Sequence, residues 1–589
     1  MFNLLDSQRG SLTRMLQLSE SSGPTETWKV LVYDKAGQEI LAPLLKVGAL
    51  RSLGVTLHLP LHSDRQAIPG VPVVYFMDPS EANLTRLVSD LSGSLYESVY
   101  VNFTSSISKV ALQGLASRLS PPVRIAQIVD RCSSFVCLGP QAFSLGLPGT
   151  YSALHVPHAI ESEISSLVNR IVENLFSVIV ATRQVPVIRA APGEAAEMVG
   201  RALGIKIREF IASGGVVASE LSLSPKADAL GGSAGRPVLV LLDRDVDLAS
   251  PLAHTWGYQP LLHDALGMKS GRVKLQNGKE FDVDGSNDQF YQQFASAPFP
   301  AVATALNEQL ADFNKKRQEI SEKNGSLTAA IDALPQLSDW KRSLDLHTGL
   351  ATALLGQIGA RKLDRLFEWE LEVARKGVTA SLTDLEAIVA DVEDKKMTSI
   401  DKVRAVLVMA LKKSKELTPA HWEQLTKAIA NEDLSHALKY LKYIASVKSM
   451  GSTVSSAGAS SSGAAGAGGA LVRGLLSAGM ANIKNILPSK EELPVTKIVE
   501  ELVNNDPQQQ TKISENFVYV DPRAPEGSVR YRGVFRAAIV CIIGGANFVE
   551  MQNVHEAASK AGRTVLYGGT DFVAPSDLAN ELAAIGKML

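Results

Sequence analysis

The stretch from Val238 to Met268 reads VLVLLDRDVDLASPLAHTWGYQPLLHDALGM and decides how the rest of the chain is interpreted. Its first five residues are apolar, as expected for a central parallel strand that is buried on both faces. Asp243, Asp245 and Asp247 follow directly, and a segment rich in His, Trp and Tyr comes after Pro251. Because ligands of open α/β sheets often bind just beyond the strand ends, this layout raises the question of an enzyme site.

Three interpretations of these aspartates differ in what they require. A calcium loop needs Gly at its sixth position and Glu at its twelfth, but counting from Asp243 these positions hold Leu248 and His254. An Asp-x-Asp pair at a strand end also suits a divalent ion that bridges a sugar-nucleotide diphosphate. In the third interpretation the aspartates are structural: they cap turns and pair with Arg244 or a distant arginine. Residue chemistry alone favours this third interpretation.

Length and composition indicate a large soluble protein. A chain of 589 residues is too long for one hydrophobic core and predicts roughly three or four domains. The net charge of −2 gives no global attraction to nucleic acid, and three cysteines fit a reducing cytosol rather than a disulfide scaffold or zinc site. No apolar run reaches the ~18 residues of a spanning helix, so any membrane role is expected to be peripheral. The first residues predict an amphipathic helix rather than a signal peptide.

Strands alternate with helical patterns in the first part of the chain, which is typical of βαβ units and a parallel sheet. From about Phe290 to Val447 the pattern is helical, and Pro335 predicts a bend or loop within Leu327–Arg342. The Gly/Ser/Ala run Met450–Gly469 predicts a flexible linker. Because strands return after this helical part, we expect it to be inserted into the second α/β domain. The predicted strands are 29–34, 55–59, 71–76, 98–103, 123–129, 135–138, 185–189, 238–242, 537–543 and 564–569.

Motifs for enzyme chemistry are weak throughout the sequence. It contains no P-loop, G-x-G-x-x-G or H-E-x-x-H motif. The segment Ile543–Asn547 lacks the third glycine of a phosphate-binding turn and predicts a tight turn that needs glycine. His254 and His263 lack a third ligand at helical spacing, which argues against zinc. The sequence therefore predicts no catalytic residue, no metal and no cofactor.

Six stretches of the chain together resemble the Sec/Munc (SM) family of SNARE-binding proteins, in particular its ER–Golgi, Sly-type branch. They are DRDVDLASPLAHTWGYQPLLHDAL from Asp243, WKVLVYDKAGQEILAPLLKV from Trp28, GVTLHLPLHSDRQAIPGVPVVYF from Gly54, VPVIRAAPGEAAEMVGRAL from Val185, LPVTKIVEELV from Leu493 and IIGGANFVEMQN from Ile542. The resemblance implies an α/β fold shaped as a three-domain arch. Two parallel-sheet domains would carry a largely helical domain inserted into the second. The implied boundaries are 1–136 for domain 1, 137–253 and 481–589 for domain 2, and 254–480 for domain 3.

The function that the resemblance implies is not enzymatic. Such a protein binds a syntaxin-5-class Qa-SNARE and promotes SNARE complex assembly and membrane fusion in ER–Golgi vesicle transport. The implied partners are that Qa-SNARE, an R-SNARE and the assembled SNARE bundle, with a Rab GTPase and tethering complexes as further candidates and no nucleic acid. The protein would be a cytoplasmic monomer, peripherally associated with ER and Golgi membranes. Three alternatives stay open: an SM protein of another trafficking step, a generic tethering scaffold, and a metal-dependent nucleotide-sugar transferase built on Asp243 and Asp245.

The resemblance also implies three SNARE-binding surfaces. A pocket on domain 1 for the N-terminal peptide of the syntaxin is assigned to Leu112, Leu115, Ala116 and Ile128; alternatively, these residues simply pack against the sheet. Lys46 matches a basic position of the central cleft, whereas His58 replaces an acidic residue of some relatives. Leu334, Pro335, Leu337 and Trp340 are assigned to the helical hairpin on which family members template SNARE helices. The hairpin connection near 322–325 is shorter than in animal and yeast members, so a lid role of that loop is not carried over.

Overall fold

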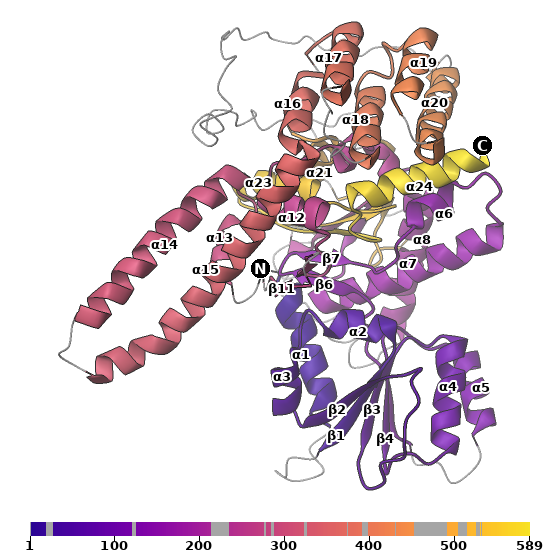
Figure 1. Ribbon diagram of the computed structural model, residues 1–589. Helices are drawn as coiled ribbons and strands as arrows, with labels where there is room; N and C mark the ends of the chain where they lie inside the picture. Colours follow the sequence, from indigo (N-terminus) through magenta and orange to yellow (C-terminus); the bar gives the residue numbers. More distant parts are fainter. Residues whose placement is uncertain are drawn as a thin grey trace. The chain divides into compact units, whose positions relative to one another are not determined.

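The computed structural model describes residues 2–18, 28–119, 125–213, 235–275, 278–283, 285, 288–322, 327–373, 375–390, 399–429, 432–452, 492–504, 515–525, 530–531 and 533–589. The chain forms two compact units. Unit 1 contains Met1–Asp247 and Leu493–Val573, and unit 2 contains Leu248–Glu492 and Ala574–Leu589 (Figure 1). The three-domain boundaries stay a prediction. All but the first three residues of the predicted linker Met450–Gly469 lie outside the described residues.

Unit 1 begins with a parallel five-stranded sheet in the order β2-β1-β3-β4-β5. The strands are β1 (Lys29–Tyr33), β2 (Val55–Pro60), β3 (Val73–Met77), β4 (Val99–Phe103) and β5 (Ile125–Asp130). Helices α2 (Lys35–Leu41) and α3 (Val47–Ser52) cover one face, and α4 (Glu81–Ser92) and α5 (Lys109–Arg118) cover the other (Figure 1). The central β3 is buried at every position, whereas most positions of β2 and β5 are exposed because they form the edges of the sheet.

The second sheet of unit 1 has seven strands in the order β12-β8-β9-β13-β14-β7-β6. The strands are β6 (Val136–Gly139), β7 (Ala142–Ser144), β8 (Val187–Ala190), β9 (Val238–Asp243), β12 (Val518–Val520), β13 (Ala537–Ile543) and β14 (Thr564–Gly569). β9 pairs in parallel with β13, although the helical part of the chain lies between the two strands in the sequence. This pairing confirms the predicted insertion of the helical part. β12 pairs with β8, and β6 with β7, in antiparallel orientation, whereas the alternation of strands and helices predicts only parallel pairs.

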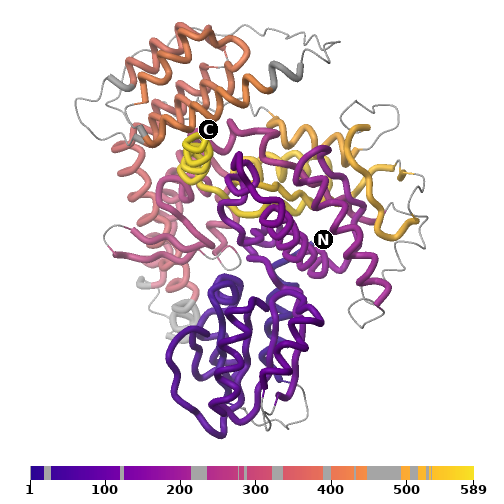
Figure 2. Tube along the Cα trace, turned by 90° about the vertical axis from the view of Figure 1, so that its right-hand side faces the viewer, coloured from indigo at the N-terminus to yellow at the C-terminus, as the bar shows by residue number. Residues whose placement is uncertain are grey.

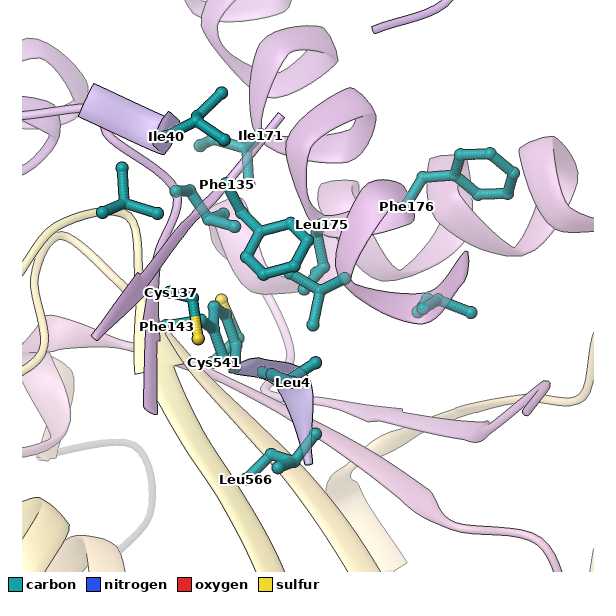
Figure 3. Packing of buried hydrophobic residues seen from close by; sticks show 14 of the residues in the cluster. Leu4, Ile40, Phe135, Cys137, Phe143, Ile171, Leu175, Phe176, Cys541 and Leu566 are labelled. Carbon is teal, nitrogen blue, oxygen red and sulfur yellow. The ribbon is translucent and has the colours of Figure 1, made fainter. Parts of the chain in front are cut away.

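One apolar core connects the two sheets of unit 1. Helices α1 (Leu4–Leu16), α7 (Glu161–Thr182) and α8 (Ala195–Ala212) contribute buried residues to it, and α6 (Thr150–His155) packs against it. The helices α21 (Pro494–Asn504) and α23 (Phe548–Lys560), which also belong to unit 1, pack against each other. Figure 3 shows Phe135 with Ile171 and Leu175 of α7, and Cys137 beside Cys541 on the strands below. The first helix of the chain is part of this core, as an amphipathic helix should be.

The helix α7 is the one described helix that is long and apolar enough to cross a membrane. Its apolar residues are used within unit 1, because Ile171, Leu175 and Phe176 are buried in the core. Core helices of globular proteins satisfy the same length and composition, so α7 is explained as a core helix.

Unit 2 is mainly helical. Its helices are α11 (Ala249–Leu252), α12 (Tyr258–Leu266), α13 (Gln289–Phe294), α14 (Phe299–Glu322), α15 (Leu327–Arg361), α16 (Leu363–Val373), α17 (Val378–Ala390), α18 (Ser399–Lys412), α19 (Pro419–Ala428), α20 (Glu432–Ser452) and α24 (Pro575–Met588). A short antiparallel pair, β10 (Arg272–Lys274) and β11 (Glu280–Asp282), completes the described part. The C-terminal α24 packs against α18 and α20 (Figure 2). The approach is close: a Cβ at Gly586 would lie 1.9 Å from the carbonyl oxygen of His436.

The sequence predicts a bend or a loop at Pro335. The loop is wrong, because α15 is one helix from Leu327 to Arg361. Proline removes one backbone hydrogen bond and crowds the preceding turn, at a cost of ~3 kcal/mol. A helix of 35 residues retains its remaining hydrogen bonds on both sides of Pro335, so the proline does not end it.

Candidate functional site

The residues predicted to form the peptide pocket lie at the β5 edge of the five-stranded sheet. Leu112 and Ile128 are 39% and 37% exposed, and Ala116 is also exposed. Ile128 is in register with Val101, which belongs to the core beneath α4 and α5. Since paired residues of parallel strands point to the same face, the side chain of Ile128 lies on the face that α5 covers. Leu112, Ala116 and Ile128 therefore form an exposed apolar patch at this edge, here called the α5/β5 patch.

Leu115 has a different role from its predicted neighbours. It is only 1% exposed and packs in the core between α5 and the sheet. The i, i+3 and i+4 spacing brought Leu112, Leu115 and Ala116 to one side of the helix, but a helix lying on a sheet buries only the centre of that side. Leu115 thus supports the patch from below, which matches the alternative that the sequence analysis left open for it. Val110, 78% exposed on the same helix, was not singled out by the sequence.

Lys46 and His58 lie near the opposite edge of this sheet. Lys46 is an exposed residue at the start of α3, and the exposed His58 is on the edge strand β2. His58 Nδ1 lies 3.1 Å from the Tyr33 hydroxyl, and the two rings stack. The next residue after Lys46, Val47, is a half-exposed apolar side chain that the sequence analysis missed. The arrangement presents mixed basic, aromatic and apolar groups, without the acidic group of some relatives.

The predicted hairpin residues lie on α15, which packs along α14 (Figure 1). The side chains of Leu334 and Pro335 are outside the described ones, and Leu337 is half-buried. Trp340 packs edge-on against Phe313 of α14, with ring centroids 5.4 Å apart. The ammonium group of Lys316, also on α14, lies 5.3 Å from the Trp340 ring. Trp340 therefore joins the two helices, and its ring is committed to that contact.

The first half of the Val238–Met268 stretch organises unit 1. Asp243 accepts a hydrogen bond from the backbone N–H of Ala196 at the start of α8, and burial raises the pKa of Asp243 to about 7. Asp245 accepts from the Tyr151 hydroxyl at 2.8 Å and pairs with His155 at 3.0 Å. Asp243 and Asp245 thus have structural contacts, as the third interpretation expected, and Arg244 donates a hydrogen bond to the carbonyl oxygen of Asp247.

Arg244 pairs with Glu550 of α23. Both side chains are buried, and the two guanidinium N–H groups donate to the two carboxylate oxygens at 2.9 and 2.5 Å. The Tyr567 hydroxyl donates to the same carboxylate at 2.6 Å. The turn at Gly544–Gly545 is equally constrained, because Gly545 has φ +115° and a Cβ there would lie 2.1 Å from a side-chain carbon of Val573. The prediction that this turn needs glycine is confirmed.

The second half of the stretch organises unit 2. His254 Nδ1 lies 2.6 Å from Glu370 of α16, and its backbone N–H donates to the same carboxylate. Asp264 accepts hydrogen bonds from Arg404 and Arg361, which hold its pKa below the usual range against the effect of burial. The histidine, tyrosine and aspartate residues that looked like a binding segment therefore connect helices of this unit.

The buried thiols argue against nucleophilic catalysis at cysteine. Burial raises the pKa of Cys132 to about 11 and the pKa values of Cys137 and Cys541 to about 12. Because the thiolate is the nucleophile, all three groups are unreactive at neutral pH.

The surfaces described above occur on a chain with relatives along its full length. Residues 29–581 match the Sec1 family. The chain is 33% identical to Sec1 family domain-containing protein 1 of Mus musculus, covering 99% of this chain and 98% of the relative. It is 33% identical to SEC1 family transport protein SLY1 of Arabidopsis thaliana, covering 100% and 97%. The crystal structure of Sly1p in complex with an N-terminal peptide of Sed5p matches with TM-score 0.81 and 26% identity, covering 100% of this chain and 99% of that one. The chain therefore belongs to the Sec1 family.

Proposed function

We propose that this protein binds the N-terminal segment of a syntaxin-5-class Qa-SNARE and promotes SNARE assembly in ER–Golgi transport. The observation that carries the proposal is the full-length likeness to Sly1p, a protein solved with an N-terminal peptide of Sed5p. The likeness extends to the relatives named SLY1 and sly1, which match over nearly their whole length.

The α5/β5 patch has the physical properties that a short peptide requires. It combines exposed apolar side chains, Leu112 and Ile128, with the edge strand of a sheet. Apolar contacts supply affinity by removing surface from water, and an edge strand offers backbone hydrogen bonds to an extended segment. The buried Leu115 keeps the helix in place, so the patch is formed before the peptide binds.

Calorimetric titration of the syntaxin N-terminal peptide into the full chain tests the proposal. Leu112→Asp should weaken binding by roughly a hundredfold, or ~3 kcal/mol, because a carboxylate would be buried without a partner. Val110→Asp is the matched control: it introduces the same charge into the same helix, two residues away on another side. Wild-type affinity in Leu112→Asp, or equal losses in both variants, would contradict the assignment of the patch.

Leu115→Lys is not a suitable test of this site. The residue is almost completely buried in the core of the five-stranded sheet, so a lysine there would destabilise the fold itself. Loss of binding in that variant would not distinguish a disrupted pocket from a disrupted domain.

The remaining roles are part of the same proposal. Lys46 would contact the Qa-SNARE, and the α14–α15 pair would template SNARE helices, with Leu334, Pro335 and Leu337 as contacts and Trp340 as the residue that keeps the pair together. The protein would act without a cofactor as a peripheral component of ER and Golgi membranes, held there by its SNARE partners. A vesicle fusion assay with ER–Golgi SNAREs checks this role, which predicts faster fusion in the presence of the protein.

A nucleotide-sugar transferase is not favoured by the site. That activity requires Asp243 and Asp245 to hold one ion together, but the Asp243 carboxylate is buried against the start of α8. A nucleotide sugar titrated into protein already equilibrated with a divalent ion should give no heat of nucleotide binding, whereas nucleotide binding that is lost in Asp243→Asn would favour the transferase.

A further inference from the structure

His155, Glu194 and Asp245 converge at the carboxyl end of β9. They come from three elements: the last residue of α6, the residue before α8, and the 3-10 turn η2 (Arg244–Val246). One potential ligand atom from each lies within 4.8 Å of the other two. The proposed SNARE-binding surfaces use none of these residues.

The imidazole of His155 is oriented by groups outside this cluster. Its Nδ1 lies 2.8 Å from the carbonyl oxygen of Tyr151, and because a carbonyl only accepts, Nδ1 carries the hydrogen. The Tyr151 ring stacks on the imidazole at 4.2 Å. Nε2 is thereby directed to the carboxylate of Asp245, 3.0 Å away, and donates to it; a bound metal ion would take the place of this proton. A histidine whose other nitrogen donates to a backbone carbonyl is the arrangement that metal-binding histidines usually show.

Asp245 is held in a similar way. Its second carboxylate oxygen accepts a hydrogen bond from the Tyr151 hydroxyl at 2.8 Å. One tyrosine therefore positions both His155, through its carbonyl, and Asp245, through its hydroxyl. Such support of two potential ligands by the same residue fixes their geometry before any ion is bound.

The charges at this place favour a cation. Glu194 and Asp245 contribute two carboxylates near the start of α8. The N-terminus of a helix stabilises anions, which explains why acidic side chains can gather there. His155 contributes at most one positive charge against the carboxylates of Glu194 and Asp245, so a divalent ion would compensate them more completely.

We propose that His155, Glu194 and Asp245 form a binding site for a divalent transition-metal ion of the Zn²⁺ class. An imidazole nitrogen together with two carboxylate oxygens suits Zn²⁺ better than Mg²⁺ or Ca²⁺, which take oxygen ligands. His155 and Asp245 are partly exposed, so water completes the coordination. The ion would fasten α6, the start of α8 and the end of β9 to one another, which is a structural role separate from SNARE binding.

Zinc titration of the full-length protein after chelator treatment tests this site. The wild type should bind one Zn²⁺ that Glu194→Gln binds at least about tenfold more weakly. Glu194 is exposed, so this variant should fold normally, which circular dichroism checks. Asp245→Asn and His155→Asn should lose the same ion, while His158→Asn, an exposed histidine of the same segment, should retain it.

Two further readouts make the outcome decisive. Co²⁺ should give visible d–d absorption in the wild type that is reduced in Glu194→Gln, and Zn²⁺ should raise the unfolding midpoint of the wild type more than that of the variant. Identical zinc binding in the wild type and Glu194→Gln would overturn the proposal. So would the absence of zinc uptake by the wild type at about 100 μM, far above the Kd of a formed site.

Discussion

Replacing Glu550 by glutamine should destabilise the seven-stranded sheet of unit 1 by about 3 to 5 kcal/mol. Glutamine has nearly the same shape and still accepts one hydrogen bond, so the change is mainly the loss of the negative charge. Arg244 is buried beside it and keeps its charge, because the guanidinium does not deprotonate in proteins. Its remaining acceptors would be the amide oxygen of the new glutamine and the carbonyl oxygens of Gly545 and Asp247, none of which carries a full charge.

The magnitude follows from the burial of the pair. A surface ion pair is worth at most ~1 kcal/mol, but both side chains here are shielded from water, so the unpaired arginine keeps its full desolvation cost. A destabilisation of ~3 kcal/mol corresponds to more than a hundredfold increase in the open population of the sheet. Hydrogen–deuterium exchange of peptides that cover β9 and β13 measures this increase directly, without requiring the two units to unfold together.

A double-mutant cycle distinguishes an unpaired charge from a lost contact. Arg244→Met combined with Glu550→Leu removes both charges and should be less destabilised than either single variant, because apolar side chains replace buried ion pairs at little cost. Exchange rates in Glu550→Gln within twofold of the wild type would refute the reasoning. Single effects that simply add in the double variant would refute it as well.

Three further predictions concern other positions. Gly545→Ala should lower the thermal unfolding midpoint by several degrees, because φ is +115° and the new methyl group would lie 2.1 Å from the Val573 side chain. Gly48→Ala is the control and should leave the midpoint unchanged, because no atom lies within 4 Å of the new methyl group. Burial lowers the pKa of His263 to about 4, so the free energy of unfolding of unit 2 should fall by about 3 kcal/mol as the pH falls from 6.5 to 4. Urea unfolding of His263→Gln should depend less on pH over this range than urea unfolding of the wild type. Trp340→Ala removes the contact with Phe313 and should increase exchange in α14 and α15 severalfold, with unit 1 unchanged.

The sign of the His263 effect follows from its neutral folded form. The unfolded state binds a proton below about pH 6.5 and the folded state only below about pH 4, so protons favour unfolding between these values. Above pH 6.5 both states are neutral at this residue, and the variant and the wild type should show the same pH dependence. A variant that is equally acid-sensitive would show that another group titrates.

Strands with continuous apolar runs were predictable from the sequence, and strands of three residues were not. The runs at Val238–Leu242 and Ala537–Ile543 became β9 and β13, since a run of this length without charges fits only a buried position. The short strands β7 and β12 were missed because three residues carry no measurable periodicity. Pro335 was misjudged because local propensity predicts the cost of a proline in a helix, not whether the rest of a long helix outweighs it.

The site was predictable only in part, and the reason is geometric. Helical spacing placed Leu112 and Ala116, both exposed, on one side of α5, but it could not show that Leu115 faces the core while Leu112 lies at its margin. The cluster of His155, Glu194 and Asp245 escaped notice for a different reason. These residues are far apart in the sequence, and only the fold of unit 1 brings the ends of α6, η2 and the start of α8 together.

The Arg244–Glu550 pair also selects the register in which β13 joins β9. The two residues are 306 positions apart, and closing a loop of that length costs ~5 kcal/mol of entropy. Doubling the length of the loop would raise this cost by only ~0.6 kcal/mol. The size of the inserted unit is therefore almost irrelevant to whether β13 joins β9; the register of the two strands is the harder requirement. Apart from Asp243 at the end of β9, both strands are apolar, so a shift by two residues would keep every apolar side chain on its own face. Such a shift would separate Arg244 from Glu550 and leave both charges buried. The pair thus penalises every register but one, at the point where the chain leaves unit 1.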